Sequence, residues 1–292
     1  MEHLQFVKNY QEDERLRSSF NKLAQSTFGI NFELWFEKGY WTDRYQPYSF
    51  IDGEKVIANV SVNKLDLIIN GETKRAIQIG TVMTHPDYRG KGLSKRLMNK
   101  VLSDYENIVD VIYLFANSSV LDYYPKFGFK EVGEHLFSKE FAISRETNTS
   151  VIKLDGSHSD DLAFIYELAK ERLPVSQQVS TVNTAELVMF YSLYVFPQNI
   201  VYLEEEKVIV IYQQKGENLH LYDVISSINI NLHSIIKKIA SERNTKVIFH
   251  FTPNLSEDVG SKPYKGEEIL FVKSKAGLEF PKQFKYPMTS KA

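Results

Sequence analysis

The residues best suited to chemistry lie in one segment of the first half, residues 82–98. An apolar stretch runs into a loop with Gly90 and Gly92, and a helical pattern begins directly after Gly92. Glycines let backbone N–H groups approach a ligand closely, and the first turn of a helix has N–H groups without partners. Such a loop suits a pyrophosphate. The segment also carries five basic residues and no acidic one between Tyr88 and Ser103: Arg89, Lys91, Lys95, Arg96 and Lys100.

A purely structural interpretation of the same loop is available. The glycines could close a strand–turn–helix connection, with the basic side chains forming a solvated helix face. Neither G-x-G-x-x-G nor a G-K-[ST] sequence at the spacing of a P-loop is present. The loop alone therefore leaves both interpretations open, and a second signal is needed.

The second signal lies downstream, at residues 117–129. The loop resembles motif A of the GCN5-related N-acetyltransferase (GNAT) superfamily, [Q/R]-x-x-G-x-[G/A], in which Arg89 and Gly92 match and Ser94 departs. The family's next motif, N-x-x-A-x-x-[F/Y]-Y-x-x-x-G-[F/Y], is similar to residues 117–129 and departs only at Val120. The resemblance covers roughly residues 1–145. Within the superfamily, the chain is similar to Eis-type (enhanced intracellular survival) acetyltransferases without their third domain.

The resemblance implies acetyl-CoA as cosubstrate and no metal. The family splays two parallel strands apart, here residues 77–84 and 109–116. Backbone groups of the first strand would then hold the pantetheine and acetyl group: Val82, Met83 and Thr84. The loop and first helical turn would receive the pyrophosphate: Arg89, Gly90, Lys91, Gly92, Leu93, Ser94 and Lys95.

Catalytic roles follow from the second motif. Tyr124 matches the family's general acid, a phenol near the CoA sulfur; the alternative is an ordinary half-buried aromatic residue. Asn117 either binds the pantetheine or caps the helix that follows. Tyr123 and Phe127 are interpreted as core packing.

The sequence names no general base. The strand over residues 78–84 contains no carboxylate. Three routes for deprotonation remain: His85 at the strand end, water with backbone carbonyls, or the C-terminal carboxylate of Ala292, which the similarity to the Eis type suggests. For the acceptor side, one aromatic cluster either packs on the sheet or forms a wall for a cationic amine: Phe32, Trp35, Phe36, Tyr40 and Trp41.

Composition narrows the function classes. The 292 residues are 43% apolar and 25% charged, which favours two globular domains. Because cysteine is absent, thiol nucleophiles, Cys-ligated zinc and disulfides are excluded. The net charge of −2 provides no overall attraction to nucleic acid or an anionic membrane. No secretory signal or membrane-spanning apolar run is visible, so we expect a cytoplasmic protein.

Hydrophobic periodicity predicts similar element orders in the two halves. In the first half it predicts strands at 3–9, 48–51, 55–69, 74–84, 109–115 and 129–141, and helices at 12–27, 32–40, from Gly92 and at 120–126. In the second it predicts helices at 160–173, 184–196 and 232–243, and strands at 199–212, 218–225 and 246–251. Glu-Lys-Val-Ile occurs at 54–57 and at 206–209, at the same point of the order, which favours a duplication.

The predicted fold class is therefore α/β (α+β): a GNAT fold with a central mixed sheet flanked by helices, followed by a second, degenerate GNAT-like domain. We expect the domains at 1–145 and 150–292. The second half has no glycine pair and no Arg or Lys at the equivalent junction, residues 223–233, so we expect one active site per chain.

The expected activity is direct transfer of an acetyl group from acetyl-CoA to a primary amine of a small molecule, peptide or protein. We expect no nucleic acid and no membrane partner, and a homo-oligomer is compatible with the sequence. Two alternatives remain: a non-catalytic acyl-CoA sensor or interaction module, and a two-domain binding protein whose glycine loop is structural.

Overall fold

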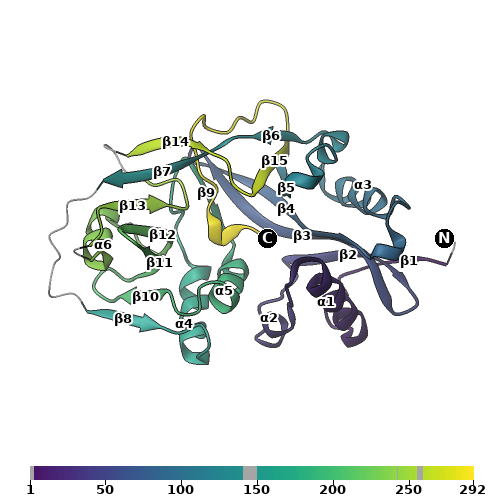
Figure 1. Cartoon of the computed structure of the whole chain (residues 1–292), viewed down its shortest axis with the longest axis horizontal. Coiled ribbons are helices and arrows are strands. Elements are labelled where there is room, and N and C mark those ends of the chain that lie inside the picture. Colours follow the sequence, from purple (N-terminus) through teal and green to yellow (C-terminus); the bar gives the residue numbers. More distant parts are fainter. Residues whose placement is uncertain (1–2, 141–149, 242, 255–258) are drawn as a thin grey trace.

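The computed structural model describes residues 3–140, 150–241, 243–254 and 259–292. Its strands form two mixed sheets, one built mainly from each half of the chain, and helices flank them (Figure 1). The predicted mixed α/β class is confirmed, and the two sheets fit the expected tandem arrangement.

The elements of the first half follow the predicted order. Its helices are α1 (Glu14–Phe28), α2 (Glu33–Glu37) and α3 (Leu93–Tyr105). Its strands are β1 (Gln5–Lys8), β2 (Tyr45–Asp52), β3 (Lys55–Ile69), β4 (Glu72–Thr84), β5 (Val111–Asn117), β6 (Lys130–Val132) and β7 (Glu134–Glu140). The expected helix over 120–126 is instead two 3₁₀ turns, Ser118–Val120 and Tyr124–Phe127, because Pro125 has no N–H for a continuous helix.

The second half contains two short strands that periodicity did not predict, β8 (Val151–Leu154) and β9 (Val179–Val182). The predicted strand over 199–212 is a hairpin of β10 (Ile200–Leu203) and β11 (Val208–Lys215). The other strands are β12 (Asn218–Ile225), β13 (Lys246–Phe249), β14 (Gly260–Tyr264) and β15 (Glu268–Ser274). The helices are α4 (Ser159–Lys170), α5 (Ala185–Tyr194) and α6 (Leu232–Ile239).

The first sheet positions the site. Its order is β1-β2-β3-β4-β5-β15-β6, and β9 adds to β3. Strands β2, β3 and β4 form the expected antiparallel meander, because Gly53, Asn70 and Gly71 supply the positive φ angles that the tight turns need. Strands β4 and β5 are parallel and joined through α3.

The two sheets exchange strands. Strand β7 leaves the first half and pairs with β13 and β14 in the second sheet. In return, β15 pairs with β5 and β6 in the first sheet (Figure 1). The domain division near residue 145 stays a prediction, and elements from both sides of it complete each sheet.

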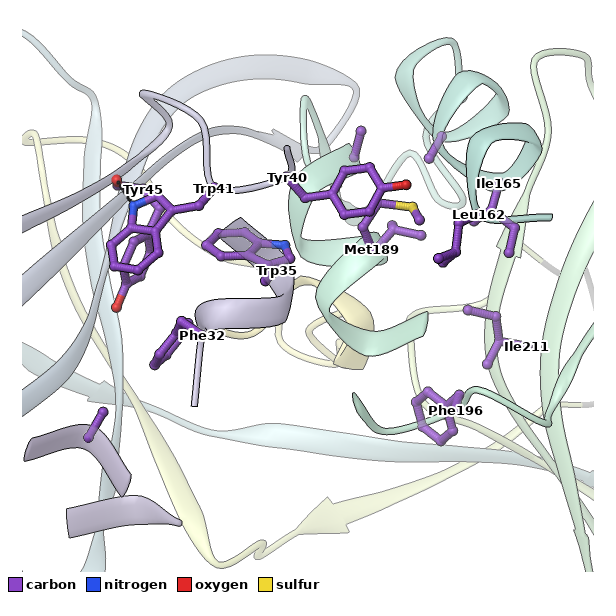
Figure 2. Close-up of a cluster of buried hydrophobic side chains, with 14 of the residues drawn as sticks. Phe32, Trp35, Tyr40, Trp41, Tyr45, Leu162, Ile165, Met189, Phe196 and Ile211 are labelled. Carbon is purple, nitrogen blue, oxygen red and sulfur yellow. Dashed lines mark hydrogen bonds between the residues drawn. The ribbon is translucent and has the colours of Figure 1, made fainter. Parts of the chain in front are cut away.

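Separate cores cover the two faces of the first sheet. Helix α3 packs on one face through Leu97, Met98 and Val101, which are fully buried. On the other face, helices α1 and α2 share a core with α4 and α5 of the second half, shown in Figure 2. The two halves therefore share one apolar cluster, in addition to the core under α3 and a further core around α6.

Candidate functional site

Strands β4 and β5 separate at the level of Ile79. Their paired positions run from Ala76 and Val111 to Ile79 and Leu114, and no later pair joins them. Beyond this point β4 still pairs with β3, whereas its other edge faces the gap. The gap is lined by main-chain groups of the predicted Val82, Met83 and Thr84, because a strand edge without a neighbour has free N–H and C=O groups.

A β-bulge accompanies the separation. Between β3 and β4 the register shifts from Ser61–Gly80 to Asn59–Met83, so β4 contains one extra residue there. At the bulge Thr81 has a φ of 48°. After it, Val82 packs toward α3 and Met83 is buried on the opposite face, with α1.

Directly after β4, the glycine loop leads into the N-terminus of α3. Gly90 and Gly92 have φ angles of 74° and 72°, and Gly92 is the N-cap residue, with no side-chain hydrogen bond to the first turn. A Cβ atom at either glycine would meet no atom within 4 Å, so the space outside the loop is open. The first N–H groups of α3 are therefore available to an anion, which the macrodipole also favours.

The polar side chains of the loop fix its shape. The Thr84 and Ser94 hydroxyls are 2.8 Å apart and join the strand end to the helix start. Arg89 Nε donates to the carbonyl of Thr84 at 3.2 Å, and Lys91 Nζ donates to the carbonyl of Asp87 at 2.9 Å. Lys95 is exposed and Leu93 is buried under the helix. The predicted phosphate-binding residues are thus collected at one end of α3.

Tyr124 begins the second 3₁₀ turn and is 5% exposed. Its ring packs against Phe129 and against Phe271 of β15, so a strand from the second half helps to place it. Burial raises the pKa of Tyr124 to about 12, with a smaller contribution from Tyr123. The phenol therefore keeps its proton at neutral pH, and no described residue hydrogen-bonds its hydroxyl.

Asn117 caps the turn that follows β5. Its side-chain oxygen accepts hydrogen bonds from the N–H and the hydroxyl of Ser119, at 3.0 and 2.6 Å. This geometry favours the capping interpretation over a contact with pantetheine. Phe127 is buried, and Tyr123 is partly buried with an inward hydroxyl that lacks a hydrogen-bond partner in the described structure.

Of the predicted routes for deprotonation, residue 292 is the one brought against the separated part of β4. Gln78 Nε2 donates to the main-chain oxygen of Ala292 at 3.2 Å. Gly80 leaves room for it, because a Cβ atom there would lie 3.0 Å from that oxygen. His85 instead lines an open groove between α1 and the β2–β3 turn, with Nδ1 3.6 Å from Asp87.

The aromatic cluster is core rather than a ligand wall. Phe32, Trp35, Tyr40 and Trp41 are each less than a tenth exposed, and Phe36 is partly buried. Trp35 contacts Phe190 of α5, and its Nε1 donates to the carbonyl of Glu186 at 2.9 Å. Figure 2 shows Tyr40 beside Met189 of the same helix. The packing interpretation of this cluster therefore describes it better than a cation-binding surface.

Sequence reasoning missed a buried polar group beneath the bulge. Tyr45, Asn59 and Ser61 are at most 3% exposed and connect to Thr81. The available signal was the spacing of Asn59, Ser61 and Asn63, which places three polar residues on one face of an otherwise apolar strand.

Within the described ranges, no group of three or more His, Asp or Glu side chains could hold a metal ion. None of the described helices is long and apolar enough to cross a membrane.

The sequence profile of an acetyltransferase (GNAT) domain matches residues 8–132. Residues 8–132 therefore form a domain of the GNAT acetyltransferase type. No protein of curated function matches the sequence.

Solved structures share the fold over most of the chain. A probable N-acyltransferase from Enterococcus faecalis has a TM-score of 0.61 at 15% identity, covering 93% of this chain and 72% of that one. A GCN5-related N-acetyltransferase from Kribbella flavida has a TM-score of 0.57 at 15% identity, with the same coverage. Eis1 from Mycobacterium abscessus has a TM-score of 0.57 at 13% identity, covering 91% and 72%. At these identities the likeness concerns the fold alone.

Proposed function

We propose that this protein transfers an acetyl group from acetyl-CoA directly to a primary amine, in a ternary complex at the gap between β4 and β5. One observation carries the proposal: the separated edge of β4 continues into a glycine loop and an uncapped helix N-terminus. This arrangement offers hydrogen-bond donors along the whole length of an extended, phosphorylated thiol ester.

Acetyl-CoA supplies the activated acyl group and a thiol leaving group when it is bound. Gly90, Gly92 and the first turn of α3 hold its phosphates through backbone N–H groups, with Arg89 and Lys95 adding positive charge. Main-chain groups of Val82, Met83 and Thr84 hold the pantetheine and orient the acyl carbonyl. Since the phosphates lie at α3, the amine approaches from the opposite face of the sheet.

Tyr124 is the proposed general acid. A phenol is protonated at neutral pH, and the Tyr124 hydroxyl has no competing hydrogen-bond partner among the described residues. It can therefore give a proton to the departing thiolate.

The amine must lose a proton, and residue 292 is our candidate for assisting that step. Where the chain ends at Ala292, a carboxylate lies beside Gly80, on the face of the sheet opposite α3. Water and backbone carbonyls provide the competing route. Adding two glycines after Ala292 discriminates between them, since it removes the carboxylate from this place and leaves water unaffected.

The decisive experiment measures CoA release with polyamines, aminoglycosides, amino acids and peptides as acceptors, using wild type and Tyr124→Phe. We expect at least a tenfold lower kcat for Tyr124→Phe, with an unchanged Kd for acetyl-CoA. Tyr123→Phe is the matched control, because it removes a neighbouring hydroxyl that has no partner in the described structure.

The outcomes separate the candidate functions. Full activity of Tyr124→Phe would remove this residue from its role. Acetyl-CoA binding without turnover of any amine would favour the sensor, and the absence of a shift in melting temperature with acetyl-CoA would refute both.

A further inference from the structure

Thr81 has an unusual backbone conformation for its residue type. Its φ of 48° lies in the left-handed region, which β-branched residues rarely adopt. The other non-glycine residues with positive φ in the described chain are three asparagines and one lysine. Glycine usually occupies such a bulge position. A conformation of this kind persists only where the surroundings enforce it, and such positions concentrate at functional sites.

A fully buried asparagine holds the carbonyl of Thr81. Asn59, on β3, donates through Nδ2 to Thr81 O at 2.9 Å and to Ser61 Oγ at 2.8 Å. Its Oδ1 accepts from Ser49 Oγ at 2.8 Å, and Ser49 is 2.6 Å from the Tyr10 hydroxyl. Because both ends of the amide have partners, the side chain has one orientation, and its donor is aimed at the bulge.

A buried tyrosine holds the side chain of Thr81. The hydroxyl of Tyr45 lies 2.8 Å from Thr81 Oγ1, and Tyr45 is 3% exposed. Its ring stacks on Phe32 at 5.5 Å and meets Trp35 edge-on at 5.5 Å. Trp35 in turn contacts Phe190 of α5. The aromatic cluster in Figure 2 therefore supports the bulge from the interior that both halves share.

We propose that Asn59 and Tyr45 are positioning residues, which keep Thr81 left-handed and thereby fix the β4 main chain along the acyl-CoA gap. The proposal rests on the proposed function for its catalytic consequence, but the holding of the bulge can be measured without any ligand. Without the extra residue at the bulge, Val82 and Met83 would exchange faces, since side chains alternate along a strand. The N–H and C=O groups that face the gap would change with them.

Glycine provides the sharpest test, because it adopts positive φ without enforcement. In the Thr81→Gly background, the bulge should persist whether or not Asn59 is present. We therefore expect Asn59→Ala to loosen the bulge strongly when residue 81 is threonine and weakly when it is glycine. A general loss of packing at Asn59 would act equally in both backgrounds.

The first measurement is amide hydrogen exchange of the unliganded protein over residues 79–88. Asn59→Ala should speed exchange there at least tenfold, and Thr81→Gly/Asn59→Ala should differ from Thr81→Gly by less than threefold. Asn63→Ala is the matched control, since Asn63 is a buried asparagine of the same strand that makes no side-chain hydrogen bond to the bulge in the described structure. Exchange at 79–88 that responds equally to both alanine variants would overturn the proposal.

The second measurement separates an effect on the position of the β4 main chain from an effect on the binding of CoA. Using the best amine from the acceptor panel, Asn59→Ala should lower kcat at least tenfold while the Kd of CoA, set mainly by the phosphate loop, changes less than threefold. Tyr45→Phe, which deletes one hydroxyl and keeps the ring, should show the same pattern with a smaller loss. If Asn59→Ala fails to fold, Tyr45→Phe alone and with Thr81→Gly provides the same comparison.

The two proposals can fail separately. Loss of exchange protection in Asn59→Ala, with no acetyl-CoA turnover by wild type, would refute the proposed function and keep the positioning role. Turnover by wild type with unchanged kcat and exchange in Asn59→Ala and Tyr45→Phe would refute the positioning role alone.

Discussion

The two halves contain the same strand–helix–strand unit, but the N-terminus of the helix is uncapped in the first half and capped by a side chain in the second. In the first half, β4 leads to α3, whose N-cap is Gly92 and whose first N–H groups have no side-chain partner. In the second, β12 leads to α6, whose N-cap Asn231 accepts from the N–H groups of His233 and Ser234 at 3.0 and 3.2 Å. The first N–H groups of α3 thus lack a side-chain cap, whereas two of those of α6 are capped by Asn231.

The space beside the strand differs in the same way. Where β4 and β5 separate, the edge of β4 stays open. At the end of β12, Asp223 is bound to Arg172 by two hydrogen bonds of 2.7 and 2.8 Å and receives the hydroxyl of Thr289 at 2.5 Å. The second unit is filled by its own side chains. The two units therefore share a fold but differ in the unpaired groups at the strand edge and at the helix N-terminus.

Breaking the buried ion pair at the end of β12 should have the largest effect on stability. The Arg172–Asp223 pair is almost fully buried, so Arg172→Ala leaves an unpaired carboxylate in the interior. We expect a loss of about 3–5 kcal/mol in the free energy of unfolding, measured in urea. Arg15→Ala, which breaks an exposed pair with Glu54, should change it by less than about 0.5 kcal/mol. Equal losses in both variants would contradict this account.

Acid should destabilise the same half. Burial, and then the charge of His220, lower the pKa of His250 to about 3. An unfolded histidine takes up its proton near pH 6.5. Between these values the unfolded chain binds more protons, so stability falls as the pH falls, by about 1.4 kcal/mol per unit and about 2 kcal/mol at pH 5.

Urea unfolding at pH 7.5, 6 and 5 measures this slope. His250→Gln should flatten it, whereas His158→Gln, at an exposed position, should leave it unchanged. A slope that is the same in all three proteins would exclude His250 as its source.

Restricting the backbone at the uncapped N-terminus of α3 should weaken the binding of acetyl-CoA. Gly92 has a φ of 72° and room for a Cβ atom, so Gly92→Ala tests the backbone conformation without a clash. A left-handed alanine costs about 1–2 kcal/mol, so we expect the Kd for acetyl-CoA to rise about tenfold in calorimetry. Gly39→Ala, equally left-handed and open but outside the loop, should lower stability and leave that Kd unchanged.

The smallest effect is expected from removing the N-cap side chain of α6. Asn231→Ala should reduce the free energy of unfolding by about 1 kcal/mol, because two N–H groups of α6 lose their acceptor. Its Kd for acetyl-CoA should equal that of wild type. A weaker Kd would mean that the second half takes part in cofactor binding after all.

Local sequence patterns predicted most helices and strands of the fold, but not the exchange of β7 and β15 between the two sheets. The meander over β2 to β4 and the start of α3 after Gly92 follow from turn residues and periodicity, which act over a few positions. The insertion of β15 beside β5 joins residues from opposite halves, and no short-range pattern specifies such a partner. Pro125 was the local signal that should have divided the predicted helix over 120–126.

The same division applies to the candidate site. The glycine loop and Tyr124 were predictable because motif spacing carries them, although their roles stay predictions. The contacts of Asn59 with Thr81 and of Gln78 with Ala292 depend on tertiary packing. Asn59 was nevertheless marked in the sequence by its polar character in a buried strand.

The strand exchange sets the order in which a ribosome can produce a folded molecule. Strand β5 needs β15 on one side, yet β15 is synthesised only after nearly all of the second half has emerged. A nascent first half therefore displays an apolar, unpaired strand edge of the kind that recruits other chains. Pairing over such a long separation is slow, so the waiting intermediate should depend on chaperones during synthesis.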